Sequence, residues 1–207
     1  MRTKRLSGEA RRDAIIGAAI QLFAEKGFRG ATTRELARAV GVTEPVLYQH
    51  FKTKRELYSA IIEQKAAEGM ELSDRRLGRY LAGCDDAGFL TALARLLLER
   101  YERDRSFVRL LMFSALEGHE LAELFQQRQL HCFYDLVAGY LRRRMAEGAF
   151  REMDPYLAAR LFLGMINHHG LVRVLFEDRM VRASRKVVIH EMVRTFLEGI
   201  RIKAREM

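Results

Sequence analysis

The sequence contains no tryptophan, only two prolines and only two cysteines in 207 residues. Two cysteines, Cys84 and Cys132, are too few for a disulfide framework, and they lack the spacing of metal ligands. No stretch reaches 18 consecutive apolar residues, so an ordinary membrane-spanning helix is not expected. The scarcity of proline and the lack of alternating polar and apolar runs favour helices over strands. We therefore expect an all-α protein in a reducing compartment.

Positive charge is concentrated near the N-terminus. The chain has 36 Lys and Arg against 27 Asp and Glu, a formal net charge of +9. Residues 1–60 hold 12 basic and six acidic side chains, whereas the rest of the chain holds 24 and 21. This distribution favours a polyanionic partner for the N-terminal part, with a generally basic surface as the alternative.

The basic start, MRTKRLSGEARR, precedes an amphipathic helix pattern and not an unbroken apolar run. It therefore does not resemble a secretory signal, and we expect a cytoplasmic protein. Apolar residues at Ile15, Ala19, Leu22 and Phe23 predict a first helix, and Gly27 is its stop signal.

The next segment carries the start and stop signals of a short helix. Thr32 and Glu35 fit a capping box, in which hydroxyl and carboxylate satisfy backbone donors at a helix start. Gly41 follows Val40 where a left-handed residue ends a helix. The chain is therefore expected to turn sharply after Val40.

A second short helix is predicted over 44–50. Thr43 is the candidate cap, and Pro45 is tolerated in a first turn because its missing amide has no partner there. Leu47 and Phe51 are four residues apart and are expected to face inward. The other side chains of this helix are then directed outward or to its flanks.

A third helix is predicted to start at Lys54, because Thr53 and Glu56 repeat the capping-box spacing. Two helices joined by a turn of three to four residues, with the second short and outward-facing, match a helix-turn-helix unit.

The segment T-T-R-x-L-A-x-x-x-G-V-x-x-P-x-L-Y-x-H-F-K-x-K-x-x-L resembles the DNA-binding domain of the TetR (tetracycline-repressor) family of bacterial transcriptional regulators. The resemblance covers about residues 12 to 60 and rests on many fixed offsets. Beyond residue 60 it extends only to length and helical pattern. It implies double-stranded operator DNA as a partner.

Matching positions in the family imply which residues read bases. Arg34 matches a base-reading position, and its guanidinium fork suits guanine O6 and N7. Glu44 stands where the family has a base-reading glutamine. A carboxylate only accepts hydrogen bonds, so it would favour the cytosine amino group or would avoid phosphate. Pro45 and Val46 offer apolar contact to thymine methyl groups.

Other positions match residues that hold the DNA backbone in the family, namely Thr33, Tyr48, His50 and Lys54. Gln49 could contact either bases or backbone, and Thr43 completes the predicted DNA-binding set. The alternatives are that Tyr48 packs under the fold and that His50 is merely exposed. Phosphate contacts give affinity and register, whereas base contacts give discrimination.

The remainder of the chain is predicted to be helical, giving about nine helices in all. The predicted domains are a helix-turn-helix domain at 1–53 and an effector-binding and dimerisation domain at 54–207. A less periodic stretch at 72–88 is expected to interrupt the helices. Further helices are predicted over 107–116, 121–146 and 155–176, the last with Asp154 as its cap, and a final one after Ser184.

Arg142, Arg143 and Arg144 end the helix over 121–146. Basic residues in a last turn before a glycine are expected to be solvent-exposed partners of the helix dipole. DNA contact is the alternative.

The family resemblance implies a small-molecule pocket in the second domain. The candidate pocket residues are Tyr101, Phe113, Phe125, Phe133, Met165, His168 and His169. Adjacent side chains diverge by about 100° on a helix, so a metal site on the histidine pair is not expected. Two interpretations of the histidines stay open: one of them binds an effector, or both lie in an interface or a core.

The resemblance also implies a homodimer that packs through its last two helices. The helix over 155–176 is apolar on most faces, more than one intramolecular contact needs. Candidate interface residues are Leu161, Gly164, Val172, Val188, Met192, Phe196 and Ile200. A two-fold dimer would match a palindromic operator.

The sequence bears on three classes of function. We favour a homodimeric repressor that a small-molecule effector releases from its operator. An effector-independent architectural or division-linked DNA-binding protein is the alternative. An enzyme is not expected, because the sequence has no catalytic triad order, phosphate-binding glycine loop or H-E-x-x-H motif. We expect no cofactor and no metal.

Overall fold

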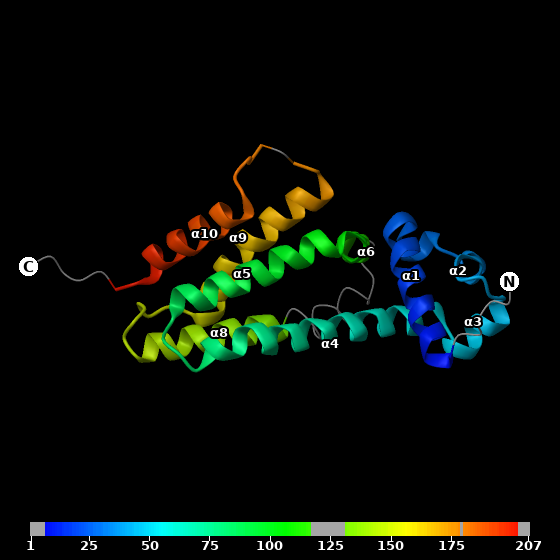
Figure 1. The fold of residues 1–207 in the computed structure, drawn as a ribbon, viewed down its shortest axis with the longest axis horizontal. Helices are drawn as coiled ribbons and strands as arrows, with labels where there is room; N and C mark the ends of the chain where they lie inside the picture. Colours follow the sequence, from blue (N-terminus) through cyan, green and yellow to red (C-terminus); the bar gives the residue numbers. More distant parts are fainter. Residues whose placement is uncertain (1–6, 117–130, 179, 203–207) are drawn as a thin grey trace, which may run out of the picture. The chain divides into compact units, whose positions relative to one another are not determined.

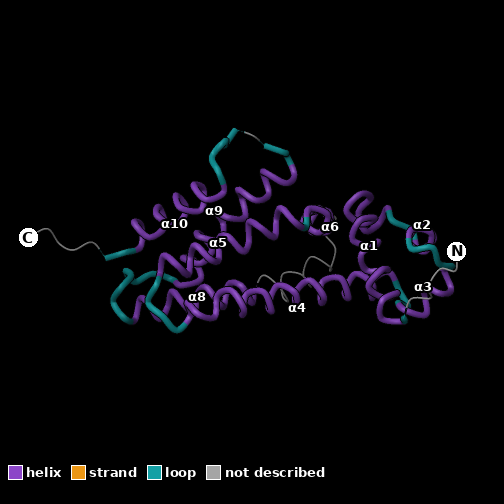
Figure 2. The backbone as a smooth tube through the Cα atoms, viewed as in Figure 1, coloured by secondary structure: helices purple, strands orange, loops and turns teal. Residues whose placement is uncertain are grey.

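The computed structural model describes residues 7–116, 131–178 and 180–202, and these form α-helices joined by turns and loops (Figures 1 and 2). The described ranges contain nine helices: α1 (Gly8–Gly30), α2 (Thr33–Ala39), α3 (Glu44–His50), α4 (Lys54–Leu81), α5 (Asp86–Arg103), α6 (Arg105–Leu116), α8 (His131–Ala146), α9 (Pro155–Leu175) and α10 (Arg185–Ile200). The predicted all-α fold is confirmed. The part of the predicted helix over 121–146 that precedes His131 lies outside the described residues.

The chain divides into two compact units. Unit 1 contains α1, α2, α3, α6 and the part of α4 up to Ala67. Unit 2 contains α4 from Glu68 onward together with α5, α8, α9 and α10. The domain boundary between residues 53 and 54 stays a prediction from the sequence.

Short-range signals set several helix starts as predicted. The Thr32 side chain accepts from the Glu35 amide at 3.2 Å, and the Glu35 carboxylate accepts from the Thr32 amide at 3.0 Å. Asp154 and Ser184 likewise accept the amides that lie three residues ahead. Thr43 occupies the N-cap position of α3 without a side-chain hydrogen bond, so its predicted capping bond is wrong. Its exposed hydroxyl is left at the surface.

Two glycines adopt the positive φ that their positions require. Gly27 has φ 73° and interrupts α1, as predicted, although one more turn follows to Gly30. Gly41 has φ 68° in the turn after α2. Any other residue type would be strained at these angles, because its Cβ would crowd the backbone.

The less periodic stretch predicted at 72–88 is mostly helix. α4 continues to Leu81, and only the four residues 82–85 separate it from α5. Leu77 is fully buried, and Leu72 and Tyr80 pack against the core of unit 2. Charged residues stand between these apolar positions, so the helical spacing is difficult to recognise from the sequence alone.

Unit 1 has a core to which α6 contributes. Leu47 and Phe51 are 3% and 2% exposed, which confirms their predicted inward orientation. Phe107 and Leu110 of α6 belong to the same core, and α6 packs extensively along α1. The Tyr58 hydroxyl lies 2.5 Å from the Ser114 hydroxyl, so a buried polar contact also joins α4 to α6.

Unit 2 is built around α9, which packs against α5, α8 and α10 (Figure 1). Phe162 is fully buried there, and its ring centroid lies 4.9 Å from that of Phe196 on α10. The apolar character predicted for α9 is thus partly satisfied within the chain itself.

The arginines near the end of α8 correct a prediction. Arg144 pairs with Asp86 at 2.8 Å, and the two side chains are only 11% and 8% exposed. Arg143 donates to the carbonyls of Leu81 and Gly83. The predicted solvent exposure is therefore wrong for Arg144, whereas the Arg143 side chain is 38% exposed while it also joins the α4–α5 turn to α8. Only Arg142 of the three is exposed.

Candidate DNA-binding surface and effector cavity

The helix-turn-helix consists of α2 and α3 with a tight turn between them. Leu36, Ala37 and Leu47 are buried and hold the two helices together. The Gly41 and Val42 amides donate to carbonyls near the end of α2, at 3.1 and 2.9 Å. Short helices on a fixed core present their remaining side chains in a set arrangement, as base reading requires.

The ten predicted DNA-binding residues all keep some surface. Arg34, Thr43, Pro45, Tyr48 and Gln49 are exposed, and Thr33, Glu44, Val46, His50 and Lys54 are half-buried. Tyr48 is 44% exposed, so the alternative that it packs under the fold is wrong. The set lies on α2, α3, the turn residue Thr43 between them and the first residue of α4 (Figure 1).

Three members of this set are linked by hydrogen bonds. The Tyr48 hydroxyl lies 3.4 Å from Thr33 Oγ1, and Thr33 Oγ1 donates to Glu44 Oε2 at 2.9 Å. The Glu44 carboxylate is therefore occupied within the protein and orients Thr33. Such a link across α2 and α3 positions Thr33 and Tyr48 before any DNA arrives.

Lys54 is also engaged within unit 1. Its ammonium donates to the Phe28 and Ala31 carbonyls, the second at 2.8 Å, and lies 4.4 Å from the centre of the Phe28 ring. These bonds tie the start of α4 to the end of α1. This positioning role was not predicted, since it depends on tertiary contacts that the sequence does not show.

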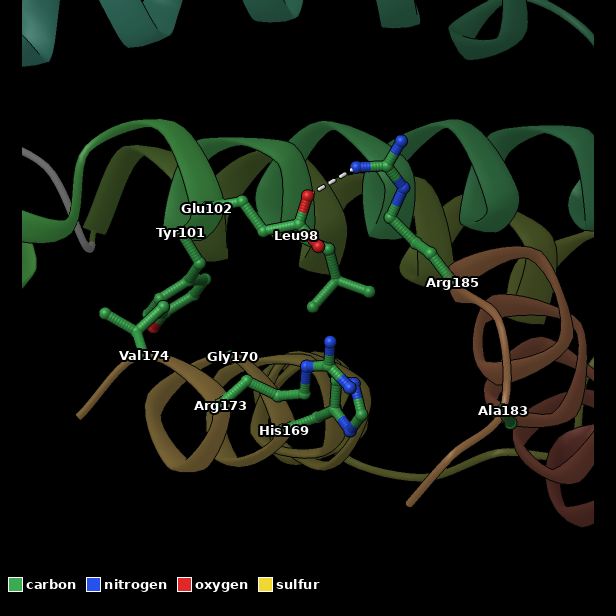
Figure 3. A pocket seen from close by; sticks show the side chains of 9 residues that line it. All are labelled: Leu98, Tyr101, Glu102, His169, Gly170, Arg173, Val174, Ala183 and Arg185. Atoms are coloured by element: carbon green, nitrogen blue, oxygen red, sulfur yellow. Dashed lines mark hydrogen bonds and ion pairs between the residues drawn. The ribbon is translucent and has the colours of Figure 1, made fainter. Parts of the chain in front are cut away.

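The predicted pocket residues lie on several helices. Phe113 is half-buried on α6 in unit 1, and Phe125 lies outside the described residues. In unit 2, Phe133 and Met165 are partly buried against the core, and His168 is exposed. Tyr101 and His169 line a common cavity in unit 2 (Figure 3).

This cavity lies between α5 and α9 and is small, about 30 Å³. Leu98 and Tyr101 come from α5, and His169 and Val174 come from α9 (Figure 3). A ligand site normally spans about 300–1,000 Å³, whereas about 10–15 Å³ already admits one water. The cavity in this conformation therefore has room for water but not for a metabolite.

Charged side chains close one side of the cavity. Arg185 donates to Glu102 at 2.7 Å, as the dashed line in Figure 3 shows. Burial and the positive charge of Arg173 lower the pKa of His169, which favours a neutral imidazole. A neutral imidazole can donate one hydrogen bond and accept another.

Tyr101 lies directly against α9 because residue 170 is glycine. A Cβ at Gly170 would come within 2.5 Å of the Tyr101 ring. The Tyr101 hydroxyl donates to Asn167 Oδ1 at 3.2 Å, and burial raises its pKa to about 12. The hydroxyl therefore stays protonated at neutral pH and can act as a donor.

The predicted interface residues divide between surface and core. Leu161 is 53% exposed and Gly164 is exposed, whereas Val172, Val188 and Met192 are half-buried. Phe196 and Ile200 are buried in the core of unit 2, at 6% and 3% exposure.

Exposed apolar surface on α9 and α10 includes residues that were not predicted. Tyr156 and Leu157 on α9 and Val187 on α10 are all about half exposed. Leu157, Leu161 and Gly164 follow a spacing of four and three residues, which places them along one face of α9.

Within residues 7–116, 131–178 and 180–202, no helix combines the length and the apolar character needed to span a bilayer. The same ranges contain no group of three or more His, Cys, Asp or Glu side chains suited to a metal ion.

An exposed helix-turn-helix joined to a second helical unit defines a two-domain DNA-binding regulator. The model of the bacterial regulatory proteins of the tetR family matches residues 15–61, and that of the AefR-like transcriptional repressor C-terminal domain matches residues 87–199. The chain therefore belongs to the TetR family, and it is a DNA-binding transcriptional regulator and not an enzyme.

Two curated relatives cover most of the chain. YvkB of Bacillus subtilis, an uncharacterised helix-turn-helix transcriptional regulator, is 23% identical over 191 residues, which are 90% of this chain and 95% of the relative. The nucleoid occlusion factor SlmA of Marinobacter nauticus is 32% identical over 144 residues, 69% of this chain and 70% of the relative.

Among solved structures, the chain shares its fold with AibR in complex with isovaleryl coenzyme A and operator DNA. The TM-score is 0.67 at 23% identity, and the match covers 89% of this chain and 97% of that chain. At this identity the likeness shows the fold alone.

Proposed function

We propose that the chain is a homodimeric repressor that a small-molecule effector releases from a palindromic operator. The observation that carries this proposal is the surface of the helix-turn-helix and the start of α4, where ten predicted DNA-binding residues keep some exposure on a packed core. The match of residues 87–199 to a repressor C-terminal domain supports repression over activation.

Within this proposal, the contacts divide into two tasks. Arg34 at the start of α2 reads a base, with Glu44, Pro45 and Val46 shaping the choice of sequence. The backbone contacts come from Thr33, Tyr48, His50 and Lys54, with Thr43 and Gln49 beside them. The hydrogen bond from Thr33 to Glu44 supports a positioning role for Glu44 beside any contact with a base.

The exposed strip of Leu157, Leu161 and Gly164 supports a dimer through α9. An apolar strip of this kind would remain in water in a monomer, whereas a two-fold axis buries it against its own copy. Val187 extends the apolar surface onto α10. Phe196 and Ile200 would then support the interface from the core, since little of their surface is left for a partner.

Effector binding would require the cavity between α5 and α9 to open. Tyr101 and His169 offer a phenol oxygen and a neutral imidazole to a ligand, while Leu98 and Val174 are apolar. Only Asp104 separates α5 from α6, so a shift of α5 is passed along the chain to a helix of unit 1. A ligand that binds the opened form better would then lower operator affinity by population shift.

The fold shared with AibR, which was solved with isovaleryl coenzyme A, suggests acyl-CoA thioesters as the first candidate effectors. The test is fluorescence anisotropy on the DNA that flanks the chain's own gene, titrated with isovaleryl-CoA, longer acyl-CoAs and free CoA. We expect one acyl-CoA to release the DNA. Operator affinity that never changes across a broad metabolite library would overturn effector release.

The dimer has its own test, in which sedimentation equilibrium compares Leu161→Lys with Leu116→Lys. Leu116 is 85% exposed on α6 and serves as the matched control. We expect the first variant to be monomeric and to bind the operator weakly, and the second to remain dimeric. A monomeric wild type, or a dimeric Leu161→Lys variant, would contradict the proposed interface.

An effector-independent architectural or division-linked role is the second candidate. The relative SlmA is a nucleoid occlusion factor, and the cavity of about 30 Å³ is too small for a metabolite without rearrangement. A cell-wide DNA-binding map separates the two functions. A few promoter sites favour the repressor, whereas many distributed sites favour the architectural role.

A further inference from the structure

A second and much larger hollow lies elsewhere in unit 2. It is a groove of about 690 Å³ between the end of α4 and the first half of α5. This volume lies within the range of small-molecule sites, about 300–1,000 Å³. Arg75, Arg76 and Arg79 line it from α4, and Arg95 lines it from α5. The lining therefore carries a net positive charge, most of it on the α4 wall.

Two of these arginines are neutralised by glutamates. Arg76 pairs with Glu99 at 2.6 Å, and Glu99 is the one carboxylate among the residues that line the groove. The Arg76 guanidinium lowers the pKa of Glu99, so the pair is ionised at neutral pH. Arg75 pairs with Glu71 at 2.5 Å, one helical turn back on α4.

Arg79 and Arg95 have no carboxylate partner among the described residues, and each belongs to a different wall. The Arg79 guanidinium donates to the Tyr80 hydroxyl at 2.7 Å and lies 4.6 Å from the centre of that ring. Asp85 lies in the α4–α5 turn as the cap of α5, and its Oδ1 accepts from the Gly88 amide at 2.8 Å. Two guanidinium groups are thus left for an anion.

The shape of the groove depends on small residues of α5. Ala87, Gly88 and Ala92 line it, and Thr91 adds a hydroxyl. A Cβ at Gly88 would overlap Asp85 Oδ2 and lie 2.7 Å from the Tyr80 ring, so glycine leaves room for both the cap of α5 and the α4 side chain. The lining of α5 extends to Glu99, eleven residues beyond Gly88, or about 16 Å of helix.

We propose that this groove binds a small organic phosphate that carries a diphosphate group. Arg79 and Arg95 bind the two phosphates from opposite walls, because guanidinium forks match phosphate oxygens in bidentate geometry. Thr91 donates a further hydrogen bond. The Arg76–Glu99 pair and the α4–α5 turn bound the groove at its two ends, which suits a compact ligand better than a long polyanion.

This site shares no lining residue with the cavity of Tyr101 and His169, and it goes beyond the proposed release from an operator. Isothermal titration calorimetry on the full chain tests it with pyrophosphate, ADP and adenosine. We expect pyrophosphate and ADP to bind saturably, one per chain, and adenosine not to bind.

The decisive variant combines Arg79→Gln with Arg95→Gln, both at exposed positions. Its matched control combines Arg142→Gln with Arg182→Gln, two exposed arginines outside the groove that carry the same charge. We expect the groove variant to bind ADP at least about tenfold more weakly, whereas the control retains wild-type affinity. Circular dichroism verifies that both variants are folded.

Several results would overturn the site. These are no saturable binding of pyrophosphate or ADP up to about 1 mM, equal losses in the groove and control variants, or binding of oligoglutamate or DNA in the groove with no small phosphate bound. A negative result for the groove would not contradict operator binding, because fluorescence anisotropy with DNA tests that proposed function separately.

Discussion

The surface of α2 and α3 and the cavity between α5 and α9 differ in how ready they are to bind. The first holds ten predicted contact residues that are all at least partly accessible, and a hydrogen-bonded link from Tyr48 through Thr33 to Glu44 already orients three of them. The second is closed to about 30 Å³ by Tyr101 and its neighbours. DNA recognition therefore needs little rearrangement, whereas effector binding needs an opening step.

The largest expected effect comes from removing a side chain of α6 from the core of unit 1. Leu110→Ala removes a side chain that is 1% exposed, which should destabilise unit 1 by about 2–5 kcal/mol. Hydrogen exchange of the α1 amides measures this loss directly. Leu116→Ala, on the same helix but 85% exposed, is the control and should change little. Unchanged exchange in α1 after Leu110→Ala would contradict the shared core.

The packing of Tyr101 against α9, which closes the cavity, can be tested at Gly170. Gly170→Ala places a methyl group 2.5 Å from the Tyr101 ring, and such overpacking should cost about 1–3 kcal/mol in urea unfolding. Gly139→Ala on α8 meets no atom within 4 Å and is the control, expected to be neutral or slightly stabilising. If Gly170→Ala is as stable as Gly139→Ala, the Tyr101 ring is not held tightly against α9 at residue 170.

A smaller effect is expected from the polar contact that ties α4 to α6. Tyr58→Phe removes a hydroxyl that lies 2.5 Å from Ser114 Oγ, which should cost about 1 kcal/mol in unfolding free energy. Ser114 retains its bond to the Leu110 carbonyl at 3.0 Å, which limits the loss. A double-mutant cycle with Ser114→Ala isolates the pair, and a coupling near zero would show that the bond is not formed in solution.

The smallest effect is a pH dependence at the start of α2. Hydrogen bonds from Lys26 and Thr32 lower the pKa of Glu35 from 4.5 to about 2. Because the pKa falls on folding, this contribution is present above pH 4.5 and is lost as the pH falls toward 2. Urea midpoints of wild type and Glu35→Gln should therefore converge over this interval.

Glu25→Gln, at an exposed position on α1, is the control for the pH series. A difference between wild type and Glu35→Gln that stays constant from pH 6 to pH 2 would contradict the proposed capping interaction.

Local signals made the DNA-binding part predictable. The capping box of Thr32 and Glu35, the left-handed Gly41 and the bounds Glu44–His50 depend on neighbours within a few residues. Such interactions between near neighbours can be recognised directly in the sequence.

The second unit was less predictable because its features depend on distant partners. The Arg144 side chain is 11% exposed and pairs with Asp86, which lies 58 residues earlier in the chain. The burial of Phe196 depends on Phe162, and the continuation of α4 through Leu77 depends on the core of unit 2. Apolar spacing alone does not say whether a stripe faces its own core or a second copy.

The central claim is that α2 and α3 read an operator through separate base and backbone contacts. Selection of bound sequences from a randomised DNA library, followed by affinity measurement, tests it with wild type, Arg34→Ala and Lys54→Ala. Wild type should select a palindrome, and Arg34→Ala should lose about 1–3 kcal/mol of discrimination at one position of each half-site. Lys54→Ala should weaken all sequences alike. Equal loss of specificity in both variants, or no palindrome at all, would contradict the account.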